Sequence, residues 1–278
     1  MKILANSFGI SERIDELINN LEEMENTKCE GCGEVELSKA SFITPFSILP
    51  LAIYAIDNNL KINCTETGYD VCSYLDTIGF PNGVTELPSN TKRYLPITKM
   101  PPIEENNLLG EYEDRILSQV NANGFWFKTS LKYLTSELVN NVNEHAKIDH
   151  YWILAQYYPY KNTCEIVMAD CGIGYKKSYE GTEFEVQTDS EAIENALEGK
   201  SSKSAKLNSP ERGKGIPTIA NMYVNGFGGK LIILSGNSMI YYKKNEKRHF
   251  KLNAKWNGSL VAINFNLKTI DPLKYVDI

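Results

Sequence analysis

The chain has no long apolar run and no leader-like beginning. Its longest apolar stretch near the start, FSILPLAIYAI at 46–56, covers 11 residues and contains Pro50. A membrane-spanning helix needs about 20 apolar residues, so this stretch predicts a core helix. The first residues lack a basic region followed by an apolar run and a small-residue cleavage site, so we expect a cytoplasmic protein with no membrane segment.

An excess of positive charge is also missing. The formal net charge is -6, from 29 basic and 35 acidic residues, which makes nucleic acid an unexpected partner. The one compact basic cluster, KKNEKRH at 243–249, is more simply a solvated hairpin turn between two strands than a binding patch. At 278 residues the chain exceeds the roughly 100 to 200 residues of a usual domain, so we expect two modest domains.

Cysteine is sparse enough to argue against a disulfide framework. The chain has six cysteines, which in a reducing cytosol are expected to be mostly thiols. Cys29 and Cys32 have the spacing of half a zinc site, but no second pair of suitable spacing follows. A glycine-rich turn with two unpaired thiols is therefore the simpler interpretation.

Three short motifs carry most of the functional information. In the first, ELVNNVNEHA at 137–146, Glu137, Asn141 and His145 recur every four residues. Each step of four advances only about 40° around an α-helix, so the three polar groups form one row. A neighbouring apolar stripe has the same spacing and consists of Leu131, Leu134, Leu138 and Val142. The polar row is therefore predicted to border the core.

The second motif follows a predicted buried strand. The run CEIVMAD at 164–170 is short, apolar and bounded by glycines, which is typical of a buried strand that enters a tight turn. Asp170 is expected at its end. Gly172 and Gly174 lack a Cβ atom, which lets a planar ligand approach the backbone and permits positive φ.

The third motif, RGKGI at 212–216, precedes a predicted helix. Gly213 and Gly215 come just before Pro217, a residue favoured at the first helical position. Free amide groups at such a helix start favour an anion. The preceding stretch from Lys200 to Lys214 has five basic residues and one acid, and its small polar composition predicts a mobile loop.

In this order, the three motifs resemble the N box and the two glycine boxes of the GHKL family of histidine-kinase-like ATPases. The match covers about residues 110–268 and is most similar to the anti-sigma-factor kinases. It implies a two-layer α/β sandwich of the Bergerat type, with a mixed sheet covered by helices on one face, that binds ATP and Mg²⁺. It also suggests a bacterial protein. Dimers are common in the family, although the chain has no heptad seam to demonstrate a homodimer.

The resemblance also implies roles for the first two motifs. Glu137 would match the catalytic glutamate that activates the attacking water or hydroxyl, and Asn141 the asparagine that holds magnesium. Asp170 would accept a hydrogen bond from the adenine amino group, with Gly172 and Gly174 lining the adenine pocket. The alternatives are ordinary exposed helix residues for the first pair and a turn-capping residue for Asp170.

For the third motif the resemblance implies an ATP lid. Gly213 and Gly215, followed by Ile216, would lie over the phosphates. Basic residues of the lid are candidates to neutralise triphosphate charge; they are Lys203, Lys206, Arg212 and Lys214. A solvated basic loop is the alternative. His145 is interpreted equally well as a phosphate contact or as a histidine at the edge of the core.

The first 85 residues have a different pattern. Helical spacing at 9–24, 43–56 and 71–78 alternates with strand candidates at 34–37 and 60–64, which predicts a smaller α/β domain. This region resembles the STAS fold of anti-anti-sigma factors. The predicted organisation is a STAS-like domain at 1–85, a proline-containing linker at 86–109 with one strand near 93–98, and an ATP-binding domain at 110–278.

The STAS-like resemblance has one instructive departure. Pro45 stands where the phosphate-accepting serine of anti-anti-sigma factors would be, with Thr44 and Ser47 beside it. The usual phosphate-accepting serine is therefore absent, and Thr44 is the alternative candidate for a phosphate acceptor. The domain is expected to be a recognition or docking module for a regulatory protein partner.

Three functions remain open. The chain is an ATPase that drives a conformational switch, a serine/threonine kinase of the anti-sigma type that acts on another protein, or a nucleotide-gated binding module without turnover. A complete histidine autokinase is not expected, because the only histidines are His145, His150 and His249, all within or after the N box. Glu137 favours catalysis, since a pure binding module needs no carboxylate beside a magnesium ligand.

Overall fold

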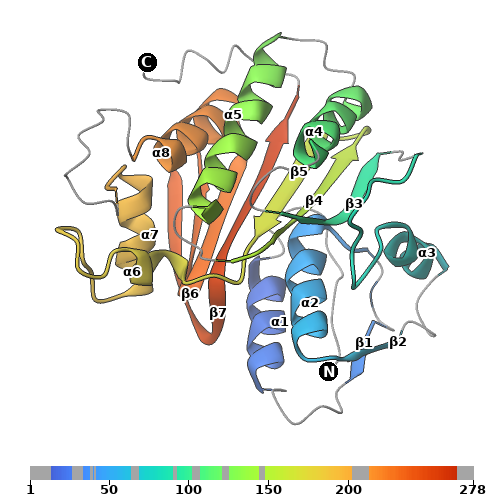
Figure 1. Cartoon of the computed structure of the whole chain (residues 1–278), viewed down its shortest axis with the longest axis horizontal. Helices are drawn as coiled ribbons and strands as arrows, with labels where there is room; N and C mark the ends of the chain where they lie inside the picture. Colours follow the sequence, from blue (N-terminus) through green and yellow to red (C-terminus); the bar gives the residue numbers. More distant parts are fainter. Residues whose placement is uncertain are drawn as a thin grey trace.

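A five-stranded antiparallel sheet forms the centre of the molecule (Figure 1). The computed structural model describes residues 14–26, 34–37, 40, 42–63, 69–89, 93–101, 107–120, 125–143, 148–201 and 213–267. The strand order is β3-β4-β5-β7-β6. The bounds are β3 Tyr94–Met100, β4 Tyr151–Tyr158, β5 Thr163–Ala169, β6 Lys230–Lys243 and β7 Glu246–Asn266. The prediction of an α/β chain is confirmed.

The prediction of a mixed sheet is wrong for these strands. Every pairing among the five is antiparallel. Two of the four pairings, β4–β5 and β6–β7, are hairpins, and hairpin neighbours are necessarily antiparallel. The β6–β7 turn includes Asn245 at φ 63°, within the basic cluster that was predicted to be a hairpin turn. The strand expected near 93–98 is β3, which pairs with β4 at the edge of the sheet.

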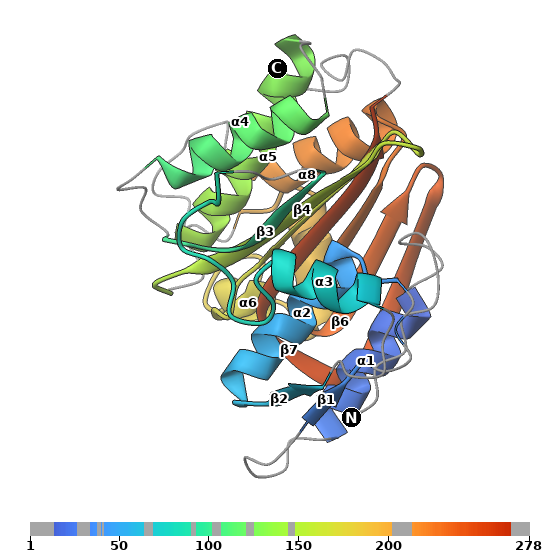
Figure 2. The ribbon, with the colours of Figure 1, turned by 90° about the vertical axis from the view of Figure 1, so that its right-hand side faces the viewer.

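Helices from the C-terminal part cover the first face of the sheet. They are α4 (Leu108–Gln119), α5 (Phe125–Asn141) and α8 (Gly215–Ala220), which continues as the π-helix η3 (Asn221–Gly226). The apolar stripe of α5 packs with inward residues of β4 and β5 in one buried cluster. Figure 2 shows α4, α5 and α8 together above the sheet. The stripe predicted from the sequence is therefore the side of α5 that faces the core.

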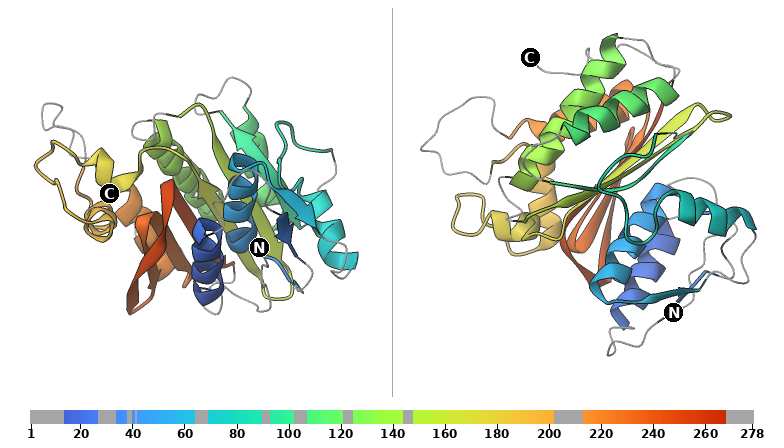
Figure 3. Two further views of the ribbon diagram at one scale, coloured as in Figure 1. Left: turned by 90° about the horizontal axis from the view of Figure 1, so that it is seen from below. Right: turned by 45° about the vertical axis from the view of Figure 1, so that its right-hand side comes forward.

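The second face is covered as well, so the expectation of helices on one face only is corrected. Here α1 (Ile14–Asn26) and α2 (Pro45–Asp57) lie against the sheet (Figure 3). Alternate residues of the strands, such as Leu154 and Val167, belong to the same buried cluster as the apolar residues of these helices. Glu22 of α1 accepts hydrogen bonds from the backbone and side-chain amides of Asn253 in β7, at 3.1 and 3.0 Å.

The N-terminal part contributes a small βαβ unit. Strands β1 (Glu34–Glu36) and β2 (Lys61–Asn63) pair in parallel, with α2 between them, and α3 (Tyr69–Thr77) follows. Thr44 caps α2, is 3% exposed, and shares a hydrogen bond with Ser47. Its burial argues against the alternative in which Thr44 accepts a phosphate in the folded chain.

Two short helices and the cysteines complete the description. Helices α6 (Gly174–Ser178) and α7 (Asp189–Leu197) pack together at the β6 edge of the sheet. Cys164 and Cys171 are free, whereas Cys72 is disulfide-bonded. Cys29 and Cys32 lie outside the described residues. None of the described helices is long and apolar enough to cross a bilayer.

Candidate functional site

Glu137 and Asn141 lie on α5 beside its buried stripe. Leu134 and Leu138 are buried, while Glu137 and Asn141 are half-buried. This is the placement expected for a polar row at the border of the core. His145, the third member of the predicted row, lies outside the described residues.

Asn141 carries an unsatisfied polar group. Its Nδ2 atom is buried and, within the described part of the chain, has no hydrogen-bond partner. A buried amide without a partner costs about 1–3 kcal/mol. Polar groups left in this state inside a folded protein call for an explanation, and a ligand site is one of the few available.

Asp170 follows β5 directly and is 4% exposed. Its Oδ1 accepts the Gly172 amide at 2.8 Å. Its Oδ2 accepts the backbone amide of Ser259, at 3.2 Å, and the Ser259 hydroxyl. Burial raises the pKa of the Asp170 carboxyl above 3.8, and the hydrogen bonds from Ser259 and Gly172 oppose that rise. The side chain is thus held firmly at the end of its strand.

Ser259 and Ser235 were missed by the sequence reasoning. Ser235, which is 1% exposed, donates to the Gly258 carbonyl at 2.8 Å and accepts the Tyr175 amide at 3.1 Å. Together the two serines fasten the turn after β5 to β6 and β7. The available signal was a small polar residue inside or next to each apolar run, in ILSGNSM and GSLVAINF.

Gly174 is required by the fold itself. Its φ is +74°, and a Cβ atom there would lie 2.8 Å from Ser235 Oγ and 3.0 Å from the Gly258 carbonyl oxygen. The prediction that this glycine admits a ligand is not tested by these contacts. These contacts show that the absence of a Cβ atom at Gly174 also lets the neighbouring strands β6 and β7 lie close to the turn.

The third motif touches the first. A Cβ atom on Gly215, the first residue of α8, would lie 2.2 Å from Glu137 Oε2. Gly213 has φ +82°, and a Cβ atom there would lie 2.0 Å from the Gly199 carbonyl oxygen. The two ends of the predicted lid therefore meet next to α5.

The remaining residues of the predicted lid motif differ in their placement. Lys214 is exposed, and Ile216 is buried in the cluster on the first face of the sheet. Lys203, Lys206 and Arg212 lie outside the described residues. Ile216 thus anchors α8 by packing.

A small cavity joins the first two motifs. It has a volume of about 20 Å³, and its walls come from α5, the end of β5, α6 and β7. Its lining includes Leu138, Asn141, Asp170, Tyr175, Ser259 and Val261. A space of this size holds about one water molecule. It is therefore far smaller than a purine, and any larger occupant requires the walls to move.

The described residues offer no preformed metal cage. Among them, no group of three or more His, Cys, Asp or Glu side chains is arranged to hold a metal ion. Asn141 stays the predicted ligand through its side-chain oxygen, because the unsatisfied Nδ2 is a hydrogen-bond donor that coordinates no cation. Magnesium is often bound in this way, through one or two protein oxygens plus phosphates and water.

The chain matches no protein-family model, and searches of curated proteins and of solved structures return no match. The GHKL and STAS resemblances of its motifs therefore stay predictions. The chemistry of the site has to be derived from the residues that the fold brings together.

Proposed function

We propose that this chain binds Mg-ATP between α5, the turn after β5 and the start of α8, and turns it over to control a conformational or partner-binding switch. The observation that carries the proposal is the convergence of three motifs that are distant in sequence. Asn141 and Asp170 line one cavity, and Glu137 lies against Gly215. Polar motifs with unrelated roles would have no reason to meet at one place in the fold.

Asp170 has the capacity to recognise an amino group. An ionised carboxylate offers about four acceptor positions. Three are used, by the amides of Gly172 and Ser259 and by the Ser259 hydroxyl. About one position remains for an external donor, which suits the exocyclic amino group of adenine.

Asn141 supplies the second contact. Its amide oxygen is a hard ligand of the kind that Mg²⁺ accepts, and its buried Nδ2 awaits an acceptor. Magnesium, when bound with the nucleotide, would neutralise charge on the phosphate oxygens. The protein's own contribution is to fix the amide at the end of α5.

Glu137 is placed for a catalytic role. It lies one helical turn before Asn141 on α5 and contacts the backbone at Gly215, where the predicted lid ends. A carboxylate in this position serves as a general base towards water or a hydroxyl. A site that only binds nucleotide has no need of the Glu137 carboxylate.

The small cavity favours a switch. Because the space beside Asp170 holds only about one water molecule, nucleotide entry has to displace part of the wall, and Tyr175 on the short helix α6 is our candidate for the side chain that moves. Helix α6 packs on α7 and β6. Nucleotide binding would therefore reposition the β6 edge of the molecule.

The acceptor of the phosphoryl group is water or another protein. Thr44, the acceptor candidate at the matching place of the N-terminal domain, is buried and hydrogen-bonded. A serine/threonine kinase acting on a separate protein is the second candidate function, and the burial of Thr44 favours it over phosphorylation at that place within the same chain.

The test is ADP production from Mg-ATP by the full chain, with nucleotide binding measured separately by calorimetry. Glu137→Gln preserves shape and removes the base, so turnover should fall at least tenfold while affinity stays within about threefold. Glu86→Gln, an exposed glutamate, is the matched control. Absence of ATP binding by the folded wild-type chain would refute the proposal. Binding without turnover would favour the kinase that awaits its substrate.

A further inference from the structure

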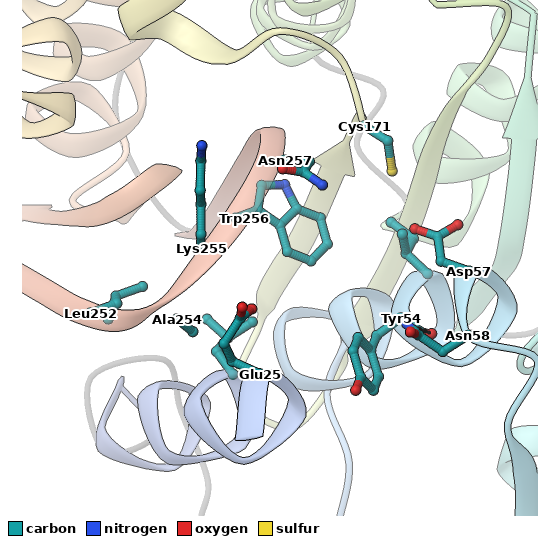
Figure 4. Close-up of a pocket in the computed structure, with 12 residues that line it drawn as sticks. Glu25, Tyr54, Asp57, Asn58, Cys171, Leu252, Ala254, Lys255, Trp256 and Asn257 are labelled. Atoms are coloured by element: carbon teal, nitrogen blue, oxygen red, sulfur yellow. Dashed lines mark hydrogen bonds between the residues drawn. The ribbon is translucent and has the colours of Figure 1, made fainter. Parts of the chain in front are cut away.

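A second and larger pocket lies on the opposite face of the sheet. It has a volume of about 220 Å³ and is enclosed by α1, α2, β7 and the residue after Asp170 (Figure 4). This is room for about seven water molecules at liquid density. The pocket therefore accommodates a small organic molecule, and it is separate from the cavity beside Asp170.

Two aromatic rings form its apolar walls. Trp256 projects from β7 and Tyr54 from α2, and Figure 4 shows both beside the same space. Trp256 is 9% exposed, and its Nε1 is a buried donor with no partner among the described residues. Aromatic faces attract cations, most strongly when water is excluded.

Two carboxylates stand at the rim. Glu25 of α1 and Asp57 at the end of α2 line the pocket, together with one base, Lys255. Figure 4 shows the Lys255 ammonium directed away from both carboxylates. Lys255 is also exposed. Among the described residues that line the pocket, acidic side chains therefore outnumber basic ones, which disfavours anionic ligands.

The environment of Asp57 shows a need for positive charge. Burial raises the pKa of the Asp57 carboxyl, and the nearby His150 lowers it. Asp57 is an exposed residue, and a cation lodged beside it would favour its ionised carboxylate.

The pocket shares its wall with the candidate nucleotide site. Cys171, in its lining, lies between Asp170 and Gly172, which are hydrogen-bonded to each other. Asn257, also in the lining, precedes Gly258, where a Cβ atom would lie 2.2 Å from the Asp170 carbonyl oxygen. Any shift of these two residues is passed directly to the backbone that holds Asp170.

We propose that this pocket binds a small organic cation with a neighbouring hydrogen-bond acceptor, such as an amino alcohol, and that its occupancy changes affinity at the Asp170 site. The cation lies between the Trp256 and Tyr54 rings, near Glu25 and Asp57. The Trp256 Nε1 is itself buried, so a hydrogen bond from it to the acceptor requires a shift of the Trp256 side chain. The coupling rests on the proposed nucleotide function, whereas cation binding does not.

Calorimetry on the full chain without nucleotide tests the site. The probes are choline and its uncharged isostere 3,3-dimethylbutan-1-ol, which have the same shape and differ in charge. Choline should bind at least tenfold more tightly, because only the cation interacts with the rings and carboxylates. Equal affinities, or no choline binding below about 10 mM, would overturn the proposal.

Paired charge variants check where the probe binds. Glu25→Gln and Asp57→Asn should each weaken choline binding about 3- to 10-fold, the range of a partly buried charge pair. Lys255→Gln, next to Trp256, should leave it unchanged or up to about threefold tighter. Thermal unfolding of each variant confirms folding. Equal effects of all three substitutions would contradict a cation between the two carboxylates.

The coupling is measured separately, as ATP affinity with and without saturating choline. A change of about threefold or more is expected, in either direction, and by reciprocity ATP should change choline affinity by the same factor. If ATP does not bind at all, the proposed function fails while the cation site stands on its own titration. If both ligands bind independently, the coupling is refuted.

Discussion

The backbone amide of Phe46 donates a hydrogen bond of 2.9 Å to Glu165 Oε1, across 119 residues of sequence. Phe46 is in the first turn of α2, and Glu165 is a 1% exposed residue of β5. A carboxylate at a helix N-terminus is favoured by the free amides and the helix dipole. This contact explains how a charged residue is retained in the middle of the sheet, and it fixes α2 on the second face.

Glu165→Ala should therefore destabilise the chain by about 2–4 kcal/mol, because it leaves the Phe46 amide buried without an acceptor. Urea unfolding measures the change. Glu165→Gln keeps an acceptor and loses only the charge, so it should cost about 1 kcal/mol or less. Equal losses for the two variants would show that the amide contact contributes little.

Asn141→Leu should separate stability from binding. It replaces a buried unsatisfied amide by an apolar group of similar size, so the nucleotide-free chain should be unchanged or up to about 2 kcal/mol more stable. Mg-ATP binding should be lost. Thermal unfolding and calorimetry on the same samples give the two values. A strongly destabilised variant would point to a structural role for Asn141.

Gly215→Ala should push Glu137 away from its present position, since the new Cβ would overlap Glu137 Oε2. The expected cost is about 1–3 kcal/mol of stability, together with loss of turnover. Glu137→Ala removes the obstructing carboxylate and serves as the second arm of a double-mutant cycle. In that background, Gly215→Ala should cost under about 1 kcal/mol. Additive effects would mean that the two residues do not interact.

Asp170 predicts a pH dependence with a defined sign. Its raised pKa means that the folded chain binds more protons than the unfolded chain from pH 3.8 up to the raised value. Stability contributed by the protonated group is therefore lost as pH rises through that window. Urea unfolding of wild type and Asp170→Asn across the window should show that the wild type loses more stability as pH rises than the variant does.

The affinity for nucleotide should change with pH in the opposite direction to the stability. The ionised carboxylate is the stronger acceptor for the adenine amino group, so ATP affinity should fall as pH drops through the raised pKa. At neutral pH, Asp170→Ala should weaken ATP about 10- to 150-fold, as expected for a charge-assisted hydrogen bond. Ser259→Ala, which removes one donor to Asp170, should have a smaller effect. Unchanged affinity in folded Asp170→Ala would remove Asp170 from the site.

The sequence predicts the local elements well because periodicity and turn residues are local properties. The α5 stripe, the strand that ends before Asp170 and the hairpin near Asn245 all follow from patterns of a few residues. The contact of Glu137 with Gly215 depends on how α5 and α8 pack, and that information is not local. The roles of Ser235 and Ser259 were missed for the same reason.

The sequence also contains a pattern that indicates that the second face of the sheet is covered. The run YWILA in β4 is apolar throughout, and CEIVMA in β5 is apolar at every position but one, which is typical of strands buried on both sides. An open face would require alternation with polar residues. The single exception in β5, Glu165, is the residue that receives α2.

The contact between Glu22 and Asn253 spans 231 residues, and this separation has a consequence for synthesis. At about 5–20 residues per second, a ribosome needs roughly 10–50 s to extend the chain from one to the other. During that time the apolar side of α1, with Ile14, Leu17 and Leu21, has not met β7. Helix α1 is therefore made well before the strand on which it packs, and its apolar side waits about that long to be covered by β7.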